Sequence, residues 1–351
     1  MKYDIKPIFK GEADCQVVAE VSANHGQNIQ LALAMIKQAA ECGADAVKFQ
    51  AYTPDTLTID SAQKVFMIDH PEWGGQTLYE LYQKAYTPWE WFDELKKACE
   101  DAGVLFFATA FDNSSVDMLE DLNVAVHKIA SFELVDVPLI RYVAGTKKPL
   151  IMSTGMATAE EIEEALAAAR DGGAEQVFLL KCVSSYPADP ADMNLRTIAD
   201  MRKRFGFPVG ISDHSKGTAV SVASVAMGAK MVEKHFALAG QEATADSFFS
   251  LDASGLKVLV RDVRETEKAL GGVGYGPTED EKKSIFFRRS LFVVKDVGEG
   301  EEFSQDNVRS IRPSAGLAPK EFGNVLGRKA ARDIKRGTPL ESKHIEGLEK
   351  P

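Results

Sequence analysis

The sequence is poor in cysteine, and this scarcity narrows the possible classes of protein. Its cysteines are far apart and none belongs to a C-x-x-C pair, which argues against a zinc knuckle and against a framework of disulfides. We therefore expect reduced thiols in a cytoplasmic protein. The four positions are Cys15, Cys42, Cys99 and Cys182.

Positive charge and long apolar runs are also scarce. The chain has 41 Lys and Arg against 52 Asp and Glu, and its formal net charge of -11 argues against nucleic acid or an anionic membrane as a partner. No apolar run approaches the roughly 18 residues that a spanning helix needs. The N-terminus, MKYDIKPIFKGEADC, lacks the apolar core of a secretory signal. A cytoplasmic location is therefore expected.

What the sequence does contain is a series of short apolar runs, most of them followed by an amphipathic helical stretch. Several runs are almost continuously apolar, as expected for strands buried on both faces. Eight such units in about 270 residues favour a (β/α)8 barrel, and a doubly wound open sheet is the alternative. The expected strands are residues 17–21, 46–50, 105–109, 126–130, 150–154, 178–182, 209–213 and 231–235.

The helical stretches carry recognisable start and stop signals. TAEEIEEALAAARDGG opens with Thr158 and Glu161 at the spacing of a capping box. NIQLALAMIKQAAECG closes on Gly43, which we expect to be a C-cap. Residues 52–88 are too long for a simple connection, so we expect them to form an excursion over the top of the barrel.

The pattern changes after residue 272. We assign residues 1–272 to the barrel, the Gly-rich and then charged residues 273–288 to a linker, and residues 289–351 to a small β-rich domain. This last segment contains an internal repeat, because 293–308 and 330–345 superpose at an offset of 37. Two copies of a hairpin-like unit predict a small pseudo-symmetric β domain.

Reactive side chains occur at the ends of the expected strands, where the active site of a (β/α)8 barrel lies. A single lysine in a buried strand is most simply explained as a side chain that extends to solvent. Two lysines among several hydroxyl groups around one rim instead predict a site for a phosphate or phosphoenol group. The rim consists of Glu20, Lys48, Gln50, Thr109, Lys128, Ser131, Glu133, Ser184, Tyr186 and Ser212.

Two histidines follow the same logic. His214 comes directly after the seventh expected strand and His235 ends the eighth. Each alone is more often a core histidine, but adjacent closing strands bring both imidazoles to one place. Two imidazoles with water and a substrate oxygen suit a divalent ion such as Mn²⁺. Zinc is less favoured because no third strong ligand is evident.

The same segments make the sequence recognisable. It resembles the sialic-acid-synthase family over nearly its whole length, through AEVSANH, GADAVKFQ, HKIASFE, IMSTGMAT, SSYPADP, GISDHS, EKHF, FRRSLFV and IRPSAGL. The resemblance implies a (β/α)8 (TIM) barrel followed by a small antifreeze-protein-like (SAF, β-clip) domain. It also implies condensation of phosphoenolpyruvate with an amino sugar. Ser184-Ser185 before Tyr-Pro, and Ser247 after Asp246, are similar to the pseudaminic acid branch of the family.

The resemblance also implies roles for individual residues. His214 and His235 would hold a divalent metal, Mn²⁺ before Mg²⁺ or Co²⁺. Glu20, Glu133, Lys48 and Lys128 would be catalytic. Arg312 would reach the sugar in the barrel of a second subunit, in a domain-swapped homodimer. The implied substrate-binding residues are Gln50, Thr109, Ser131, Ser184, Tyr186, Ser212, Asp246 and Arg312.

Three other functions compete with this interpretation. The nearest is an N-acetylneuraminate or legionaminate synthase, which differs only in its sugar. A metal-dependent barrel hydrolase would require more carboxylate or histidine ligands than are evident in this sequence. A glycan- or ice-binding protein would want a Thr-rich surface, but residues 290–351 contain only Thr338.

Overall fold

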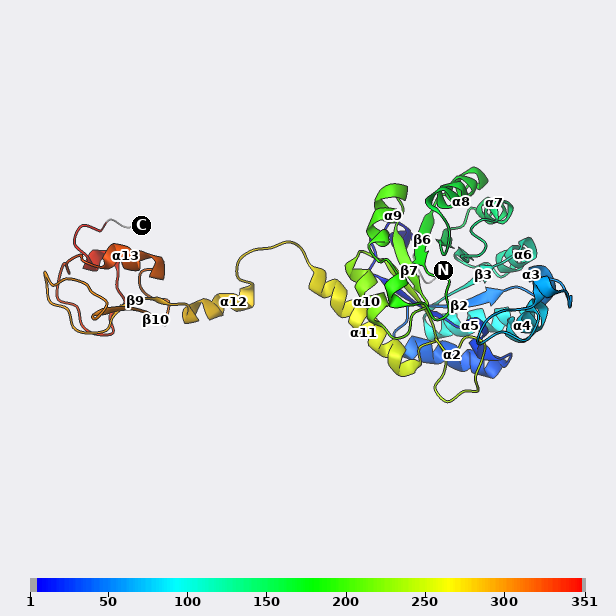
Figure 1. Cartoon of the computed structure of the whole chain (residues 1–351), viewed down its shortest axis with the longest axis horizontal. Helices are drawn as coiled ribbons and strands as arrows, with labels where there is room; N and C mark the ends of the chain where they lie inside the picture. The colour runs from blue at the N-terminus through cyan, green and yellow to red at the C-terminus, as the bar shows by residue number, and fades with distance from the viewer. Residues whose placement is uncertain (1–4, 349–351) are drawn as a thin grey trace. The chain divides into compact units, whose positions relative to one another are not determined.

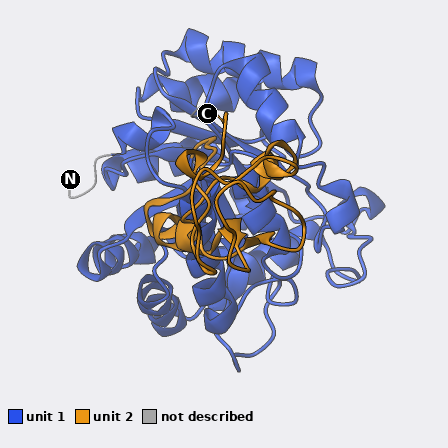
Figure 2. Ribbon diagram, turned by 90° about the vertical axis from the view of Figure 1, so that its left-hand side faces the viewer, with its two compact units in different colours: residues 1–271 blue, residues 272–351 orange. Residues whose placement is uncertain are grey.

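The computed structural model describes residues 5–348 of the chain. Its contacts divide the chain into two compact units, residues 1–271 and 272–351 (Figure 2). The Gly271–Gly272 step therefore separates two independent cores, and each unit is described by itself below.

The first unit is a closed parallel barrel of eight strands (Figure 1). The eight strands expected from the sequence are all present, so the (β/α)8 prediction is confirmed and the open-sheet alternative is wrong. Closure is made by β1 and β8, where Glu20 is paired with His235. The strands are β1 (Gln16–Glu20), β2 (Ala46–Ala51), β3 (Leu105–Ala110), β4 (His127–Ile129), β5 (Leu150–Ser153), β6 (Val177–Cys182), β7 (Val209–Asp213) and β8 (Met231–His235).

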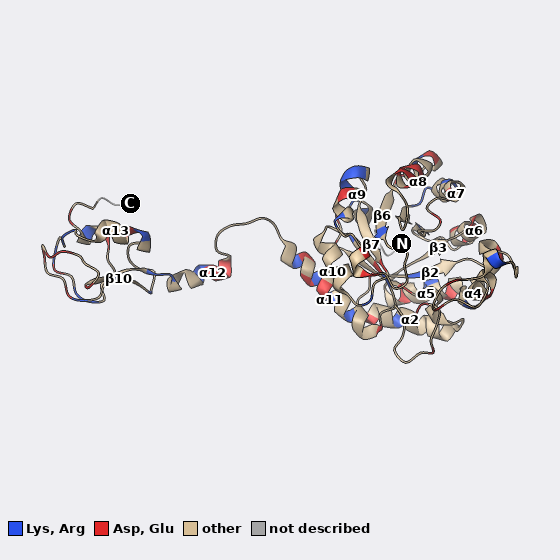
Figure 3. Cartoon of the chain, in the orientation of Figure 1, with Lys and Arg blue, Asp and Glu red and all other residues tan. Residues whose placement is uncertain are grey.

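One main helix follows each strand, and its apolar side packs on the barrel. In α8 the Thr158 hydroxyl accepts the N–H of Glu161 in the predicted capping box, and Ile162, Ala165 and Leu166 are buried at helical spacing. Charged residues colour the outer helices in Figure 3, as expected for their solvent faces. The helices are α2 (Ile29–Glu41), α5 (Phe92–Ala102), α6 (Asn113–Asp121), α7 (Val137–Gly145), α8 (Ala159–Gly172), α9 (Thr197–Phe205), α10 (Ala219–Ala226) and α11 (Ala253–Leu270).

The end of α2 differs slightly from the prediction. Its C-cap is Cys42, and Gly43 follows with φ +88°. A Cβ at Gly43 would lie 3.2 Å from Val260 Cγ1, and the left-handed backbone is the conformation that glycine tolerates best. Gly43 is therefore the residue after the C-cap.

Apolar side chains close the N-terminal end of the barrel. The short helix α1 (Lys6–Phe9) brings Phe9 against Phe178, with ring centroids 6.0 Å apart. Phe9 belongs to a buried cluster with residues from the beginnings of the strands, including Ala46 and Met231. Apolar side chains therefore fill the barrel interior at this end.

The excursion between β2 and α5 has its own secondary structure. It contains α3 (Pro54–Leu57), a 3₁₀ turn (Lys64–Phe66) and α4 (Leu78–Ala85). Thr77 caps α4 in a capping box with Glu80, and an antiparallel bridge joins Met67 to Thr77. These contacts make the excursion an ordered structure, and its two helices lie side by side (Figure 1).

The second unit is a small β-rich body. Its elements are α12 (Glu279–Ser284), β9 (Ser290–Val293), β10 (Val308–Ile311) and α13 (Phe322–Val325), and β9 pairs antiparallel with β10. A separate core includes Leu291, Phe303, Val308 and Leu340. This unit agrees with the expected small β domain.

The internal repeat has a structural counterpart in this unit. Val297 and Ile334, which are equivalent at the offset of 37, exchange both backbone hydrogen bonds, at 2.9 and 2.8 Å. Asp296 accepts the N–H of Arg336, and the equivalent Asp333 accepts the N–H of Glu299. The two copies thus pair reciprocally, although in the described part of this unit only β9 and β10 form a regular sheet.

Across residues 5–348, no helix is long and apolar enough to cross a membrane.

Candidate active site

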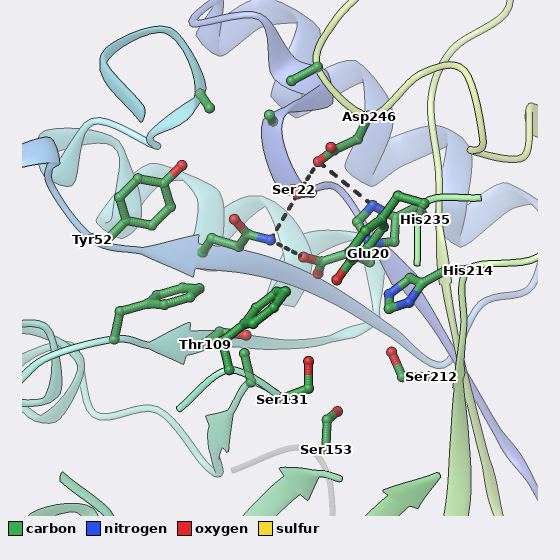
Figure 4. A pocket seen from close by; sticks show the side chains of 18 of the residues that line it. Glu20, Ser22, Tyr52, Thr109, Ser131, Ser153, Ser212, His214, His235 and Asp246 are labelled. Atoms are coloured by element: carbon green, nitrogen blue, oxygen red, sulfur yellow. Dashed lines mark hydrogen bonds and ion pairs between the residues drawn. The ribbon is translucent and has the colours of Figure 1, made fainter. Parts of the chain in front are cut away.

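A cavity of about 410 Å³, here called the central cavity, lies at the carboxyl ends of the barrel strands (Figure 4). It brings together most of the residues singled out from the sequence. Ser184 does not line it but touches a residue that does, and Arg312 belongs to the second unit. The predicted residues that line it are Glu20, Lys48, Gln50, Thr109, Lys128, Ser131, Glu133, Tyr186, Ser212, His214, His235 and Asp246.

Lys48 is the centre of a buried charged network. Its Nζ lies 3.1 Å from Glu20 Oε2, 3.4 Å from Glu233 Oε1 and 3.0 Å from Thr109 Oγ1. Burial lowers the pKa of Lys48, but the two carboxylates raise it more, and the net shift is upward. Lys48 is therefore a fixed cation at neutral pH.

The two carboxylates beside Lys48 differ. Burial raises the pKa of Glu20 to about 7, although Lys48 opposes the shift. Burial also raises the pKa of Glu233, but Lys48 and Lys128 together hold it below its usual value. Glu20 can therefore exchange a proton near neutrality while Glu233 remains ionised.

The sequence interpretation missed Glu233, although a signal was present. Glu233 and His235 are two apart on β8, so both face the barrel interior. Glu233 Oε1 accepts a hydrogen bond from Ser212 Oγ at 3.0 Å. The period of two along a strand that ends on a candidate ligand would have found it.

Lys128 makes a second cationic position with a different environment. Its Nζ donates to Ser153 Oγ at 2.7 Å and to the carbonyl oxygen of Ile129 at 2.8 Å. Burial lowers the pKa of Lys128 to about 8. Ser153, which the sequence interpretation also missed, joins Ser131 and Ser212 around this part of the cavity (Figure 4).

Ser131 and Ser184 form a hydroxyl pair beside Lys128. Their Oγ atoms lie 2.7 Å apart. Gly155, at φ +50°, allows this close packing, because a Cβ there would lie 2.5 Å from Ser131 Cβ and 2.8 Å from Ser184 Oγ. Ser184 thus contributes to the site by orienting Ser131.

The two predicted metal ligands are adjacent. The imidazole centroids of His214 and His235 lie 5.3 Å apart. His214 Nδ1 donates to the carbonyl oxygen of Val183 at 2.8 Å, which leaves the Nε2 lone pair free. His235 Nδ1 is buried without a hydrogen-bond partner among residues 5–348, and burial holds the pKa of His235 well below its usual value.

This donor set fits a divalent ion that is held by two imidazoles. A metal requires an unprotonated nitrogen of each histidine, which the lowered pKa of His235 favours. Burial lowers the pKa of His214 as well, but the neighbouring Cys182 raises it more, and the net shift is upward. Asp246 Oδ2 lies 3.9 Å from His235 Nδ1 and accepts a hydrogen bond from Ser22. In the described part of the chain, no group of three or more His, Cys, Asp and Glu is arranged to hold a metal. The other ligand positions would therefore belong to water or substrate.

Three further predicted residues complete the rim. Burial raises the pKa of Glu133 to about 7, and its Oε2 is buried without a partner in residues 5–348. Tyr186 packs on His214 with ring centroids 4.4 Å apart. Gln50 Nε2 donates to Glu20 Oε1 at 3.0 Å and to Ser22 Oγ at 2.8 Å.

Two residues lie outside this arrangement, His25 and the sequence candidate Arg312. His25 ends the turn after β1 and is buried against Thr87, with 3.0 Å from Nε2 to Oγ1, and it does not line the cavity. Burial lowers the pKa of His25 to about 4, as suits a structural imidazole. Arg312 follows β10 in the second unit and is exposed.

Fold and site together define a (β/α)8 protein whose central cavity contains two buried lysines and two adjacent imidazoles. Residues 35–275 match the NeuB family, and residues 288–346 match the SAF domain. The chain belongs to the NeuB family and carries a SAF domain. The resemblance to sialic acid synthases is thereby confirmed.

Known proteins that are similar to the chain carry related names. A pseudaminic acid synthase of Campylobacter jejuni (serotype O:2) is 42% identical, over 95% of this chain and 97% of the relative. An N,N'-diacetyllegionaminic acid synthase of Legionella pneumophila is 34% identical, over 95% of both. The crystal structure of an N-acetylneuraminic acid synthetase from Leptospira borgpetersenii, in complex with citrate, superposes with a TM-score of 0.69. It is 33% identical and covers 78% of this chain and 90% of its own.

Proposed function

We propose that this protein is a pseudaminic acid synthase. It would condense phosphoenolpyruvate with 2,4-diacetamido-2,4,6-trideoxy-L-altrose to a nine-carbon 2-keto acid. The observation that carries the proposal is the pair of buried lysines among hydroxyl groups beside two imidazoles, in a chain of the NeuB family. The choice of sugar follows the greater identity to a pseudaminic acid synthase, 42%, than to a legionaminic acid synthase, 34%.

The reaction balances without an oxidant or reductant. The methylene carbon of phosphoenolpyruvate bonds to the aldehyde carbon of the sugar, and water adds to the carbon that bears the phosphate. The C–O bond to phosphate then breaks, which leaves a ketone and inorganic phosphate. One proton from the water ends on the sugar oxygen and the other on phosphate. The net chemistry therefore requires groups that bind a trianion and groups that move protons.

The chain supplies binding groups for the phosphoenolpyruvate. Lys48 and Lys128 place two ammonium groups in a buried site, where charge-assisted hydrogen bonds are strong. Hydroxyl donors surround them, and these donors hold phosphate and carboxylate oxygens without adding charge. The hydroxyl set consists of Thr109, Ser131, Ser153 and Ser212.

Glu20 and Glu133 are the candidates for proton transfer. Burial raises the pKa of each to about 7, which lies near the working pH that general acid–base catalysis favours. Glu133 Oε2 has no partner in residues 5–348, so it is free to accept a proton from water. Glu20 is held by Gln50 and Lys48 and can orient a sugar hydroxyl.

His214 and His235 would hold a divalent ion, with Mn²⁺ preferred to Mg²⁺ or Co²⁺. Bound there, the ion would supply a Lewis acid for the sugar aldehyde. The carbonyl oxygen of Val183 accepts a hydrogen bond from His214 Nδ1, which keeps the proton on that nitrogen, and Tyr186 packs against the same ring. These contacts fix the ring that presents Nε2 to the cavity. Asp246 beside His235 would accept a hydrogen bond from the sugar or from water.

Arg312 extends the proposal to a second subunit. Its guanidinium is exposed, so it is accessible to a substrate in another chain. In a domain-swapped homodimer, the small unit of each chain would place Arg312 over the barrel of its partner. Sedimentation of the intact protein, together with Arg312→Ala kinetics in mixed dimers, tests this part independently.

The test of the function is phosphate release from phosphoenolpyruvate with Mn²⁺, with and without EDTA. The two acceptors are the trideoxy-altrose and N-acetylmannosamine. We expect EDTA-sensitive release with the altrose alone. Release with N-acetylmannosamine alone would favour an N-acetylneuraminate synthase, and release with neither sugar would contradict the proposal.

A further inference from the structure

One side of the central cavity is apolar, in contrast with its polar floor. Four of the six residues that form this side come from α3 and α4, and Tyr52 and Phe111 follow from the ends of β2 and β3. In Figure 4, Tyr52 lies on one side of the view, and His214 and His235 lie on the other. We call this side the apolar chamber; its residues are Tyr52, Leu57, Leu78, Leu81, Tyr82 and Phe111.

The apolar stripe of α4 indicates that the chamber binds a ligand with apolar groups. Leu78, Leu81, Tyr82 and Ala85 follow the i, i+3, i+4, i+7 spacing that normally packs on a protein core. Here all four line the cavity, and the first three are only partly buried. Their remaining apolar surface would be covered by a ligand.

Tyr52 adds a polar group to this apolar surface. Its ring is held edge-on between Tyr82, at 5.6 Å, and Phe111, at 5.2 Å between centroids. The residue is only 3% exposed, and its hydroxyl makes no hydrogen bond to any residue of 5–348. Tyr52 lines the cavity, so its hydroxyl can donate a hydrogen bond to a ligand bound there.

We propose that the apolar chamber selects the acceptor sugar by binding the methyl groups of that sugar. The C6 methyl and an acetamido methyl of the sugar would pack on Leu78 and Leu81, and the Tyr52 hydroxyl would donate to an acetamido carbonyl oxygen. The inference rests on the proposed function, because it places the aldehyde beside His214 and His235. Sugars with a 6-hydroxyl in place of the methyl would leave that hydroxyl against leucine without a partner.

The expected size of the effect follows from similar pockets. A single methylene in an apolar enzyme pocket changes kcat/KM by about 10- to 200-fold. Leu81→Asn keeps the approximate volume and removes the apolar surface. We expect it to lower kcat/KM for the trideoxy-altrose by about 10-fold or more, relative to 2,4-diacetamido-2,4-dideoxy-L-altrose, which carries the 6-hydroxyl. The KM for phosphoenolpyruvate should not change.

Two further variants make the test specific. Tyr52→Phe removes only the hydroxyl and should weaken the binding of both diacetamido sugars equally. Val65→Asn is the matched control, because Val65 lies in the same excursion, is 77% exposed and does not line the cavity. It should leave the kinetics of all the sugars as they are in the unmodified protein.

Binding must be measured beside turnover, so that failure of the chamber can be separated from failure of the proposed function. Calorimetric titration with the alditols, which lack the aldehyde, reports binding without chemistry. Turnover with the same sugar preference in the unmodified protein and in Leu81→Asn would refute the chamber and leave the condensation standing. Alditol binding that Leu81→Asn weakens, without turnover, would support the chamber and refute the condensation. If no sugar binds or reacts, both are wrong.

Discussion

Replacing Lys48 with methionine tests the buried charge network most directly. The substitution keeps most of the side-chain length and removes the cation that lies 3.1 Å from Glu20 Oε2 and 3.4 Å from Glu233 Oε1. Both carboxylates are almost wholly buried, so they cannot recover solvation. Removing one partner of a buried ion pair costs about 3–5 kcal/mol, and here two carboxylates lose the same partner. We expect a loss of at least that size at about pH 8.

The pKa shifts of the two carboxyl groups determine whether Lys48→Met is destabilised more at low or at high pH. Without Lys48, the pKa of Glu20, already raised to about 7 by burial, rises further, and that of Glu233 rises as well. A carboxyl whose pKa is higher in the folded state stabilises below its unfolded pKa, and this stabilisation is lost as pH rises through the folded value. Lys48→Met should therefore be destabilised less at about pH 6 than at about pH 8.

The assay is urea denaturation of the unmodified protein and the variant at both pH values, with Glu20→Gln as a partner mutation. The double variant should recover part of the loss, because one unpaired charge is gone. Lys234→Met is the control. Lys234 is equally buried but is paired with Asp213 at 2.9 Å, so Glu20→Gln should not rescue it. An equal loss of stability of Lys48→Met, relative to the unmodified protein, at both pH values and without rescue would refute the reasoning.

The remaining predictions concern the rest of the cavity. His214→Ala and His235→Ala should each abolish metal-dependent phosphate release while circular dichroism stays unchanged, and full activity in both would remove the metal assignment. Because burial holds the pKa of Lys128 at about 8, the KM for phosphoenolpyruvate should rise as pH increases through that value; a flat profile would contradict a charged Lys128 in binding. Gly155→Ala should raise the same KM several-fold, as its Cβ would displace Ser131; unchanged kinetics would show that the hydroxyl pair is dispensable.

Most of the barrel could be predicted from the sequence because buried parallel strands have a simple pattern. The run 46–50 and the strand Ala46–Ala51 agree, and 126–130 shrinks only to His127–Ile129. Strand ends place Lys48 and Lys128 at one rim without any knowledge of contacts. The same rule could not place Asp246, which comes from a loop and reaches His235 only through the folded chain.

Other parts of the site depend on tertiary packing that no local pattern encodes. The stripe of α4 looks like any core-facing helix, and only the fold reveals that Leu78 and Leu81 border a cavity. Ser153 could not be recognised as a site residue from the sequence, because it ends an apolar run as an ordinary small residue. Its importance follows from the 2.7 Å contact with Lys128 Nζ.

Lys48 and Lys128 show how the fold divides one residue type between two tasks. Both are buried on neighbouring parts of the barrel interior, yet the pKa of Lys48 rises and that of Lys128 falls. Lys48 already has two carboxylates within ion-pair distance, whereas Lys128 has a hydroxyl and a carbonyl oxygen. In the proposed reaction an incoming anion would therefore gain more from Lys128, which has no carboxylate of residues 5–348 within ion-pair distance, than from Lys48. Lys48 instead holds Glu20 in place, which in the proposed reaction would separate the binding of the anion from the group that moves a proton.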